Sequence, residues 1–272
     1  MRQAWLPFAS YNLWSLSNSR VGQEFLFCDM NRGFKKVRQK EPQVKVLLED
    51  NKHQRIGKLA QAGVYEFYQD PKLLSQSDGV EKVAAILKLN QEPEEVQERI
   101  IRILKNYCKE PILVGKQIIQ LSKGDEGFPS PIIIQEGSYC FNLYAPTDCT
   151  FKQPDGTIHI LDFKTGKSDF DRRQAYVYLL AASYLYPQQP SVASFYNLEI
   201  GLTSDIIIAT SEQLKFVQIE LQDIAKQHEL EKKRYWENPD DFATIFPPNP
   251  GTSCNYCIFS SICKFSVCEV LR

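Results

Sequence analysis

Residues 147–178 read TDCTFKQPDGTIHILDFKTGKSDFDRRQAYVY, and this stretch decides the fold that we predict for the chain. Its first half holds Asp155-Gly156 between two apolar runs. An Asp-Gly pair in this setting predicts a β-hairpin, because the favoured two-residue turns need positive φ angles that these residues accept. We therefore expect 143–151 to fold back against 157–163 as two antiparallel strands.

Two carboxylates and one lysine ammonium are expected to lie close together on one face of this hairpin. Asp162 and Lys164 point to the same face of their strand because side chains alternate with a period of two, and Asp148 can reach that face from the neighbouring strand. Two carboxylates offer oxygen ligands to a hard divalent cation, and a lysine beside them places positive charge next to an attacked phosphate. Alone, an Asp-x-Lys pair also fits the solvated face of a strand. Its place at a strand end favours a site for phosphodiester hydrolysis.

A helix is predicted for 171–186, and Gln174 and Tyr178 share one face of it because they lie four residues apart. Together with Asp148 and the run 162–166 (Asp-Phe-Lys-Thr-Gly), they resemble the PD-(D/E)XK nuclease superfamily, specifically its RecB-like exonuclease branch. That branch includes AddB-type helicase-nuclease subunits and CRISPR-adaptation exonucleases. The resemblance implies a restriction-endonuclease-like α/β fold, in which helices flank a mixed central sheet.

The resemblance also implies a metal site and a substrate. Asp148, Asp162 and the carbonyl of Phe163 would hold Mg2+ or Mn2+. The chain would hydrolyse DNA as an exonuclease, on single-stranded ends, in DNA repair, recombination or CRISPR adaptation. No phosphate-cradling G-x-x-x-x-G-K-[ST] loop occurs in the sequence, so a helicase or other repair or CRISPR subunit would be a separate chain.

Three further side chains would take part in that reaction. Lys164 would orient or deprotonate the attacking water and stabilise the charge that develops on the phosphate. Gln174 would position the lysine or the water, and Tyr178 would support the helix face or touch DNA. The catalytic candidates are therefore Asp148, Asp162, Lys164, Gln174 and Tyr178.

A second motif lies near the C-terminus, where Cys254, Cys257 and Cys263 have the spacing C-x2-C-x5-C. Iron-sulfur members of the resembling family hold a 4Fe-4S cluster with one N-terminal and three C-terminal cysteines, which implies Cys28 as the fourth ligand. Zinc accepts four thiolates equally well, and Cys268 is the rival fourth ligand. Without a metal, Cys28 fits a small buried apolar residue.

Two positions depart from the family's pattern. The family carries a glycine followed four residues later by a metal-binding histidine; Gly57 matches the glycine, but Gln61 stands at the histidine position. Glutamine is rarely a ligand, and Glu66 on the same helix is a candidate acid in its place. Where the family has glycine before the first aspartate, this chain has Ala145 and then Pro146, which predicts a strand edge or bulge. These departures motivate an alternative: a catalytically degenerate iron-sulfur DNA-binding accessory protein with the nuclease fold.

Composition bounds these hypotheses. The 272 residues can bury a full core, and 43% hydrophobic with 24% charged residues is ordinary for a globular protein. The net charge of -1 argues against a protein coated in nucleic acid, although the basic runs 32–40 and 164–173 are candidates for a local cleft. A zinc-stabilised α/β hydrolase of another kind is a further alternative.

The same composition bears on location. No apolar run is long enough to span a membrane, and residues 1–10 lack the basic start and apolar centre of a signal peptide. We therefore expect a cytoplasmic protein, in which the eight cysteines act as ligands or buried thiols. Those outside the metal motif, expected to be core thiols, are Cys108, Cys140 and Cys149.

The remaining elements are predicted from apolar periodicity. Helices are expected at 11–27, 53–69, 80–89, 93–108 and 222–236. Strands are expected at 132–134, which would open the sheet, within 139–151, and at 193–200, 205–209 and 216–219. Packing residues expected near the N-terminus are Trp5, Trp14 and Phe25. We expect one nuclease domain over 1–272, with a helical insert at 78–125 and, by the resemblance, a cysteine cluster at 247–268 that closes onto Cys28.

Overall fold

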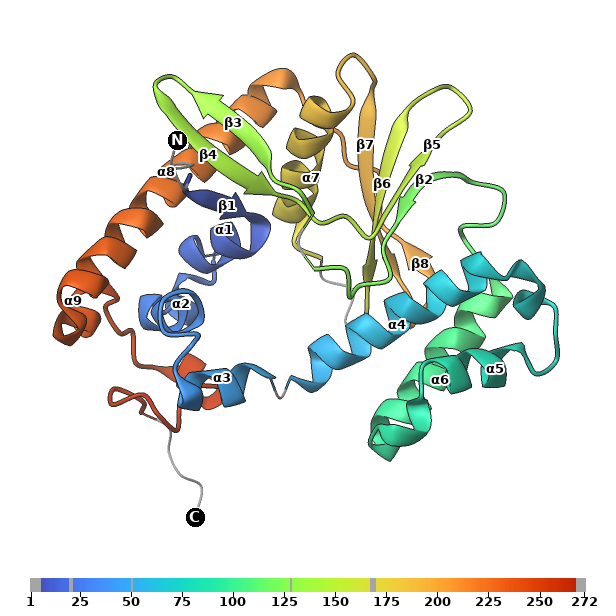
Figure 1. Cartoon of the computed structure of the whole chain (residues 1–272), viewed down its shortest axis with the longest axis horizontal. Coiled ribbons are helices and arrows are strands. Elements are labelled where there is room, and N and C mark those ends of the chain that lie inside the picture. Colours follow the sequence, from blue (N-terminus) through green and yellow to red (C-terminus); the bar gives the residue numbers. More distant parts are fainter. Residues whose placement is uncertain (1–5, 20–21, 50, 128, 167–169, 268–272) are drawn as a thin grey trace, which may run out of the picture. The chain divides into compact units, whose positions relative to one another are not determined.

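The computed structural model describes residues 6–19, 22–49, 51–127, 129–166 and 170–267. The chain divides into two compact units (Figure 1). The first, called here the terminal unit, comprises Met1–Asn51, Ile133–Leu143 and Ile219–Arg272. The second, the sheet unit, comprises Lys52–Ile132 and Tyr144–Gln218. None of the helices in the described part of the chain has the length and apolar character to cross a membrane.

The sheet unit is built on a five-stranded mixed sheet (Figure 1). Its strands, in spatial order, are β2 (Gln117–Leu121), β5 (Cys149–Lys152), β6 (Ile158–Lys164), β7 (Ser191–Asn197) and β8 (Leu202–Thr203). The β6–β7 pair is parallel, whereas β2–β5, β5–β6 and β7–β8 are antiparallel. This mixed sheet is the one expected from the sequence.

The predicted hairpin is formed by β5 and β6, with Cys149 opposite Leu161 at the end that carries the polar motif. Gly156 turns the chain with a φ of +91°, a backbone region that glycine enters without steric cost. The first strand begins at Cys149, not at Leu143 as predicted, because Leu143 belongs to another strand and 145–147 form neither helix nor strand. Proline lacks the N–H that a ladder needs, so Pro146 lies in this connection.

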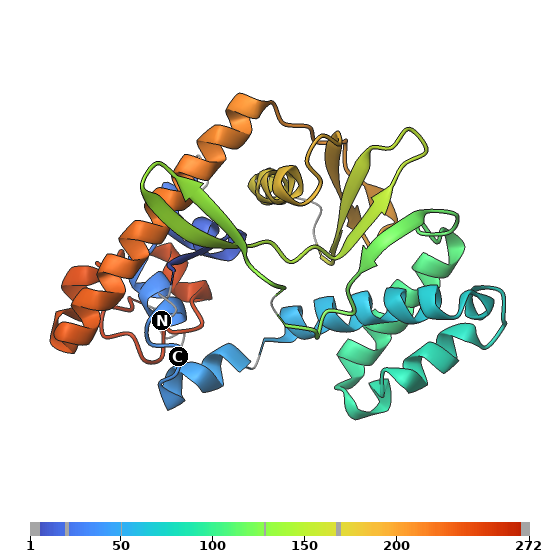
Figure 2. The same ribbon diagram turned by 45° about the horizontal axis from the view of Figure 1, so that its top comes forward.

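Helices cover both faces of this sheet. Helix α7 (Arg172–Leu185), predicted for 171–186, begins at Asp171, whose carboxylate accepts from the Arg173 N–H. Its Ala175, Leu179 and Ala182 pack with Ile160 and Phe195. The other face carries Leu161 and Phe163, which pack with α4 (Lys52–Gln69) and α6 (Glu94–Lys109); α5 (Gly79–Ile86) joins the same cluster (Figure 2). Because side chains alternate along β6, Asp162 and Lys164 face α7.

Two strand predictions differ from the structure, and two strands of the sheet unit were not predicted. Residues 216–219 lie inside α8 (Ser211–Glu237), because Val217, Leu221 and Ile224 are buried at helical spacing. Residues 205–209 form only a single bridge, between Ala193 and Ile207. Strands β2 and β8 were not predicted, and β2 lies within the range expected to be a helical insert.

The terminal unit holds a three-stranded sheet of order β1 (Phe8–Ser10), β4 (Tyr139–Tyr144) and β3 (Ile132–Glu136). Its helices are α1 (Tyr11–Ser17), α2 (Asp29–Lys36), α3 (Pro42–Glu49), the larger part of α8, and α9 (Phe242–Ile245), with short 3-10 turns at Glu24–Leu26 and Thr252–Tyr256. The expectation that 132–134 opens the central sheet was wrong: these residues pair with β4, and Ile133 is 64% exposed.

The N-terminal helix is also shorter than predicted. It ends at Ser17, and Asn18 beyond it has an extended backbone, so 11–27 is not one helix. Trp14 is buried as expected, but Phe25 is 63% exposed and does not pack. Trp5 lies outside the described residues. The basic run 32–40 is not one solvated surface, because Arg32 is buried and binds both carboxylate oxygens of Glu231.

Candidate active site

The five catalytic candidates lie close together at one end of the β5–β6 hairpin. Asp148 immediately precedes β5, Asp162 and Lys164 stand on β6, and Gln174 and Tyr178 come from α7. Tyr178 and Gln174 both donate to Oδ1 of Asp162, at 2.8 and 3.2 Å. Gln174 also donates to the Tyr178 hydroxyl at 2.6 Å. The spacing of four residues on α7 therefore brings two donors to one buried carboxylate.

Lys164 closes this network. Its Nζ lies 2.5 Å from Oδ2 of Asp162 and donates to Oε1 of Gln174 at 2.7 Å. The ammonium also lies 5.5 Å from the ring centre of Phe195, within reach of a cation–π attraction. Asp162 is only 3% exposed, so its charge is compensated by these neighbours rather than by water.

Asp148 joins the site through the backbone of β6. Its Oδ2 accepts a hydrogen bond of 2.7 Å from the N–H of Phe163. Burial raises the pKa of Asp148, and the negative charge of Asp162 raises it further; the Phe163 N–H, the Lys164 ammonium and the Gln61 side chain oppose this rise. Two carboxylates are thus held close enough to repel each other, an arrangement that a bound cation would relieve.

The position of the missing histidine is part of this site. Gln61, on α4, hydrogen-bonds to the Asp148 carboxylate and donates to the Ser122 carbonyl at 3.2 Å. Ser122 in turn donates its N–H to the Asp148 carbonyl at 2.8 Å. Glu66, the candidate replacement acid, forms an ion pair with Lys123 at 2.8 Å instead. Sequence reasoning missed Ser122, because no motif marks it.

The donor set of Asp148 and Asp162 fits a hard divalent cation. Oδ2 of Asp162 is buried and forms an ion pair with the Lys164 ammonium at 2.5 Å. Such an acceptor, next to a second carboxylate, is the kind of oxygen that Mg2+ or Mn2+ binds. Nowhere in the described ranges are three or more His, Cys, Asp or Glu side chains arranged so that they could hold a metal ion.

The cysteine motif lies in the terminal unit. Cys28 precedes α2, and its Sγ accepts from the Asn249 N–H at 3.5 Å. Burial raises the pKa of Cys263, and the nearby thiols of Cys28, Cys257 and Cys254 raise it further. Cys28, Cys257 and Cys263 pack against one core cluster of the terminal unit, while the described residues include no group of three or more cysteines arranged to hold a metal ion.

Two other groups of cysteines were predicted. Cys268 lies outside the described residues. Cys149 is fully buried, and Cys108 packs against the same core cluster of the sheet unit. Cys140 is half-buried in the terminal unit. All seven described cysteines are free thiols.

The mixed sheet thus presents two carboxylates and a lysine at a strand end, beside a helix with a Gln-x-x-x-Tyr face. Comparison with protein families assigns the class directly. The model of the PD-(D/E)XK nuclease superfamily matches residues 25–264, and the chain belongs to this superfamily. Membership indicates nuclease activity supported by divalent metal ions.

Two other comparisons add little. No curated protein matches the chain. Among solved structures, the chain is similar to one described as the crystal structure of SSO0001, with 13% sequence identity, 78% of this chain and 86% of that chain covered, and a TM-score of 0.31. A likeness this distant carries no argument about the site.

Proposed function

We propose that the protein is a metal-dependent DNA exonuclease of the RecB-like type that degrades single-stranded ends. The observation that carries the proposal is the network around Asp162, in which one buried carboxylate contacts Lys164, Gln174 and Tyr178. A buried carboxylate that shares its neighbours with a lysine and a second aspartate is suited to charge stabilisation during phosphoryl transfer.

Asp148, Asp162 and the carbonyl of Phe163 would hold Mg2+ or Mn2+. A cation at this place, when bound, polarises a phosphoryl oxygen and lowers the pKa of a bound water. Burial around Asp162 keeps water away from the carboxylate and strengthens its interaction with a cation. The repulsion between the two carboxylates supports this assignment.

Lys164 would hold the attacking water or take its proton, and would stabilise the extra charge on the phosphate. The hydrogen bond from its ammonium to Gln174 supports a positioning role for that amide. Tyr178 donates to Asp162 and would therefore keep the carboxylate oriented. Each role belongs to a side chain of this network.

Replacement of Lys164 tests the proposal. With Mn2+ and end-labelled single-stranded DNA, Lys164→Ala should slow nucleotide release by about a hundredfold or more, since a charge-stabilising group is lost. Lys152→Ala is the matched control, because Lys152 lies on β5 at the opposite end of the same hairpin. Equal activity of the two variants would reject the assignment.

We also propose a 4Fe-4S cluster held by Cys28, Cys254, Cys257 and Cys263, with zinc as the alternative metal. Support comes from the mutual proximity of these thiols. Their free state suits the cytoplasmic location that we propose, where thiols stay reduced. Anaerobic purification separates the metals: a brown protein with broad visible absorption indicates iron-sulfur, and a colourless protein that contains zinc indicates the alternative.

Gln61 favours a second candidate function. Because an amide stands where the family has a metal-binding histidine, and contacts Asp148, the protein would bind DNA through the nuclease fold without cutting it. This accessory role predicts tight DNA binding with weak Mn2+ affinity. Metal-dependent release of nucleotides from single-stranded DNA excludes it. In either role, a separate helicase or another repair or CRISPR subunit is the proposed partner.

A further inference from the structure

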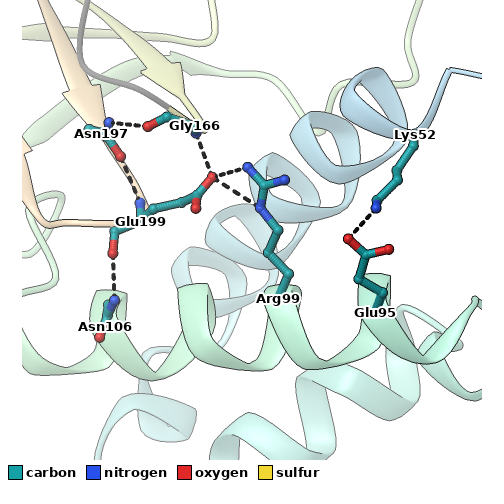
Figure 3. Close-up of polar contacts among 7 residues, drawn as sticks. All are labelled: Lys52, Glu95, Arg99, Asn106, Gly166, Asn197 and Glu199. Carbon is teal, nitrogen blue, oxygen red and sulfur yellow. Dashed lines mark hydrogen bonds and ion pairs between the residues drawn. The ribbon is translucent and has the colours of Figure 1, made fainter. Parts of the chain in front are cut away.

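The chain just beyond Lys164 is held on both sides by residues that no nuclease motif includes. Gly166 has a φ of +95°, which favours glycine, and it lies at a bend just after β6, called here the Gly166 turn. Its N–H donates to Oε1 of Glu199 at 2.5 Å, and its carbonyl accepts from the Asn197 amide at 2.9 Å (Figure 3). The carbonyl of Lys164 accepts from the Leu198 N–H at 2.9 Å. Three consecutive residues, from the last residue of β7 to Glu199, thus hold the chain at the end of β6.

Glu199 is itself held from α6. Arg99 donates to the same Oε1 through its Nε at 3.2 Å and through a second guanidinium nitrogen at 2.5 Å (Figure 3). Asn106, two turns further along α6, donates to the Glu199 carbonyl at 2.6 Å, and the Glu199 N–H donates to Asn197. Three donors therefore meet on one oxygen that is largely shielded from water, since the Glu199 side chain is 16% exposed.

These contacts differ from the other ion pair on α6. Glu95, one turn before Arg99, pairs with Lys52 of α4 and is 73% exposed (Figure 3). That pair joins two helices at the surface, where an ion pair contributes little. The Arg99–Glu199 pair instead ends on the backbone amide of Gly166, two residues from Lys164. The position of the Glu199 carboxylate therefore affects the conformation of the Gly166 turn, which follows Lys164.

We propose that Glu199 is a positioning residue for Lys164: held by Arg99, it fixes the Gly166 turn and so the direction in which β6 presents the lysine. This inference rests on the proposed nuclease function. The Lys164 ammonium has to keep contact with both Asp162 and Gln174, so a small rotation of its backbone displaces the charge from the phosphate. Displacements of about 1 Å far from the reacting atoms can cost about a hundredfold in rate.

Three variants test the proposal: Glu199→Gln, which keeps an acceptor but not the charge, Arg99→Met, which removes the cation, and Arg99→Lys, which restores it. The matched control is Glu92→Gln, which breaks the half-buried Arg55–Glu92 pair of the same helical layer without reaching Gly166. Each variant is assayed well below its melting temperature, with kcat and KM on single-stranded DNA and with amide hydrogen exchange of the segment 158–166.

Glu199→Gln and Arg99→Met should lower kcat about tenfold or more with KM within about twofold, because an interaction that serves the transition state is lost. Both variants should also speed amide hydrogen exchange at 158–166. Arg99→Lys should recover most of the wild-type kcat. Glu92→Gln should leave both kcat and hydrogen exchange unchanged. Unchanged kcat, or equal losses in Glu92→Gln, would overturn the proposal. If the wild-type protein does not cleave DNA, the proposed nuclease function is rejected. If hydrogen exchange at 158–166 is unchanged in Glu199→Gln, the proposal that Glu199 fixes the Gly166 turn is rejected, whatever the activity.

Discussion

The hydroxyl of Tyr178 donates a hydrogen bond of 2.8 Å to Oδ1 of Asp162, and both side chains are almost completely buried. Tyr178→Phe leaves this oxygen with one donor, Gln174. We expect about 1–3 kcal/mol of lost stability, the cost of depriving a buried charged acceptor of a partner, and about tenfold slower DNA cleavage. Thermal unfolding and initial rates measure the two effects.

The control for that variant lies on the same helix. Tyr184 also ends in a hydrogen bond, to Gln218 at 2.7 Å, but it is 41% exposed and does not touch the site. Tyr184→Phe should therefore change cleavage little. Should both variants lose activity equally, the contact between Tyr178 and Asp162 would have no special part in catalysis.

Gln61→His should strengthen Mn2+ binding at the sheet unit. A neutral imidazole is a better ligand than an amide, and position 61 already contacts the Asp148 carboxylate. The Mn2+ affinity, measured by calorimetric titration, and the rate of DNA cleavage should both be higher than in the wild type. Gln61→Ala should raise neither. Identical affinity in the histidine and alanine variants would place this side chain outside the reach of a bound metal ion.

His159 should contribute a loss of stability to the sheet unit in mild acid, opposite in sign to the contribution of Asp148, whose raised pKa lets the folded state bind a proton. Burial, aided by the nearby Lys116 charge, lowers the pKa of His159 to about 4, and its ring accepts or donates hydrogen bonds with Gln153 and Ser194. In the unfolded chain the pKa of a histidine is about 6.5. Between about pH 6.5 and 4, His159 is therefore protonated in the unfolded state but neutral in the folded state. The contribution of His159 to stability is therefore complete above about pH 6.5 and is lost as the pH drops toward 4, by about 1.4 kcal/mol for each pH unit.

Chemical unfolding between these pH values measures the effect. His159→Gln keeps polar atoms in place but cannot titrate, and it should flatten this part of the pH dependence. His228, whose pKa burial lowers to about 3, gives the terminal unit a separate dependence of the same sign.

Cys263→Ser should remove most of the visible absorption of an anaerobically purified protein. Cys263 has the other three proposed ligands as neighbours, and a hydroxyl is a poor substitute for a thiolate at iron. Cys140→Ser, which changes a half-buried thiol of the same unit outside that neighbourhood, should keep the absorption. Full absorption in Cys263→Ser would remove this residue from the ligand set.

The parts of the fold that were predictable are those whose reasons are local. The Asp155-Gly156 turn and the apolar runs beside it specify the hairpin, and the four-residue spacing of Gln174 and Tyr178 specifies a helix face. The run 216–219 was misjudged because four alternating residues fit either a strand or one turn of a helix. The burial of Leu221 and Ile224, which continue the helical spacing from Val217, shows that the run belongs to a helix.

The parts that escaped prediction depend on distant partners. The Arg99–Glu199 contact joins residues 100 positions apart, and Gln61 meets Ser122 across 61 positions. Neither pair carries a motif, since one charge or amide among many has no local signature. Likewise, the strand at 132–134 was assigned to the wrong sheet because alternation reveals a strand but not its neighbour.

The ion pair between Arg32 and Glu231 joins side chains separated by 199 positions. During synthesis, Arg32 has Asp29 as a nearby carboxylate partner but leaves the ribosome long before Glu231 exists, and a guanidinium that lacks one of its two partners favours water over burial. The terminal unit therefore cannot close until α8 has been made, by which time all of 52–218 is already available to fold. A nascent chain arrested before Glu231 should resist protease over the sheet unit while its first fifty residues remain open to digestion.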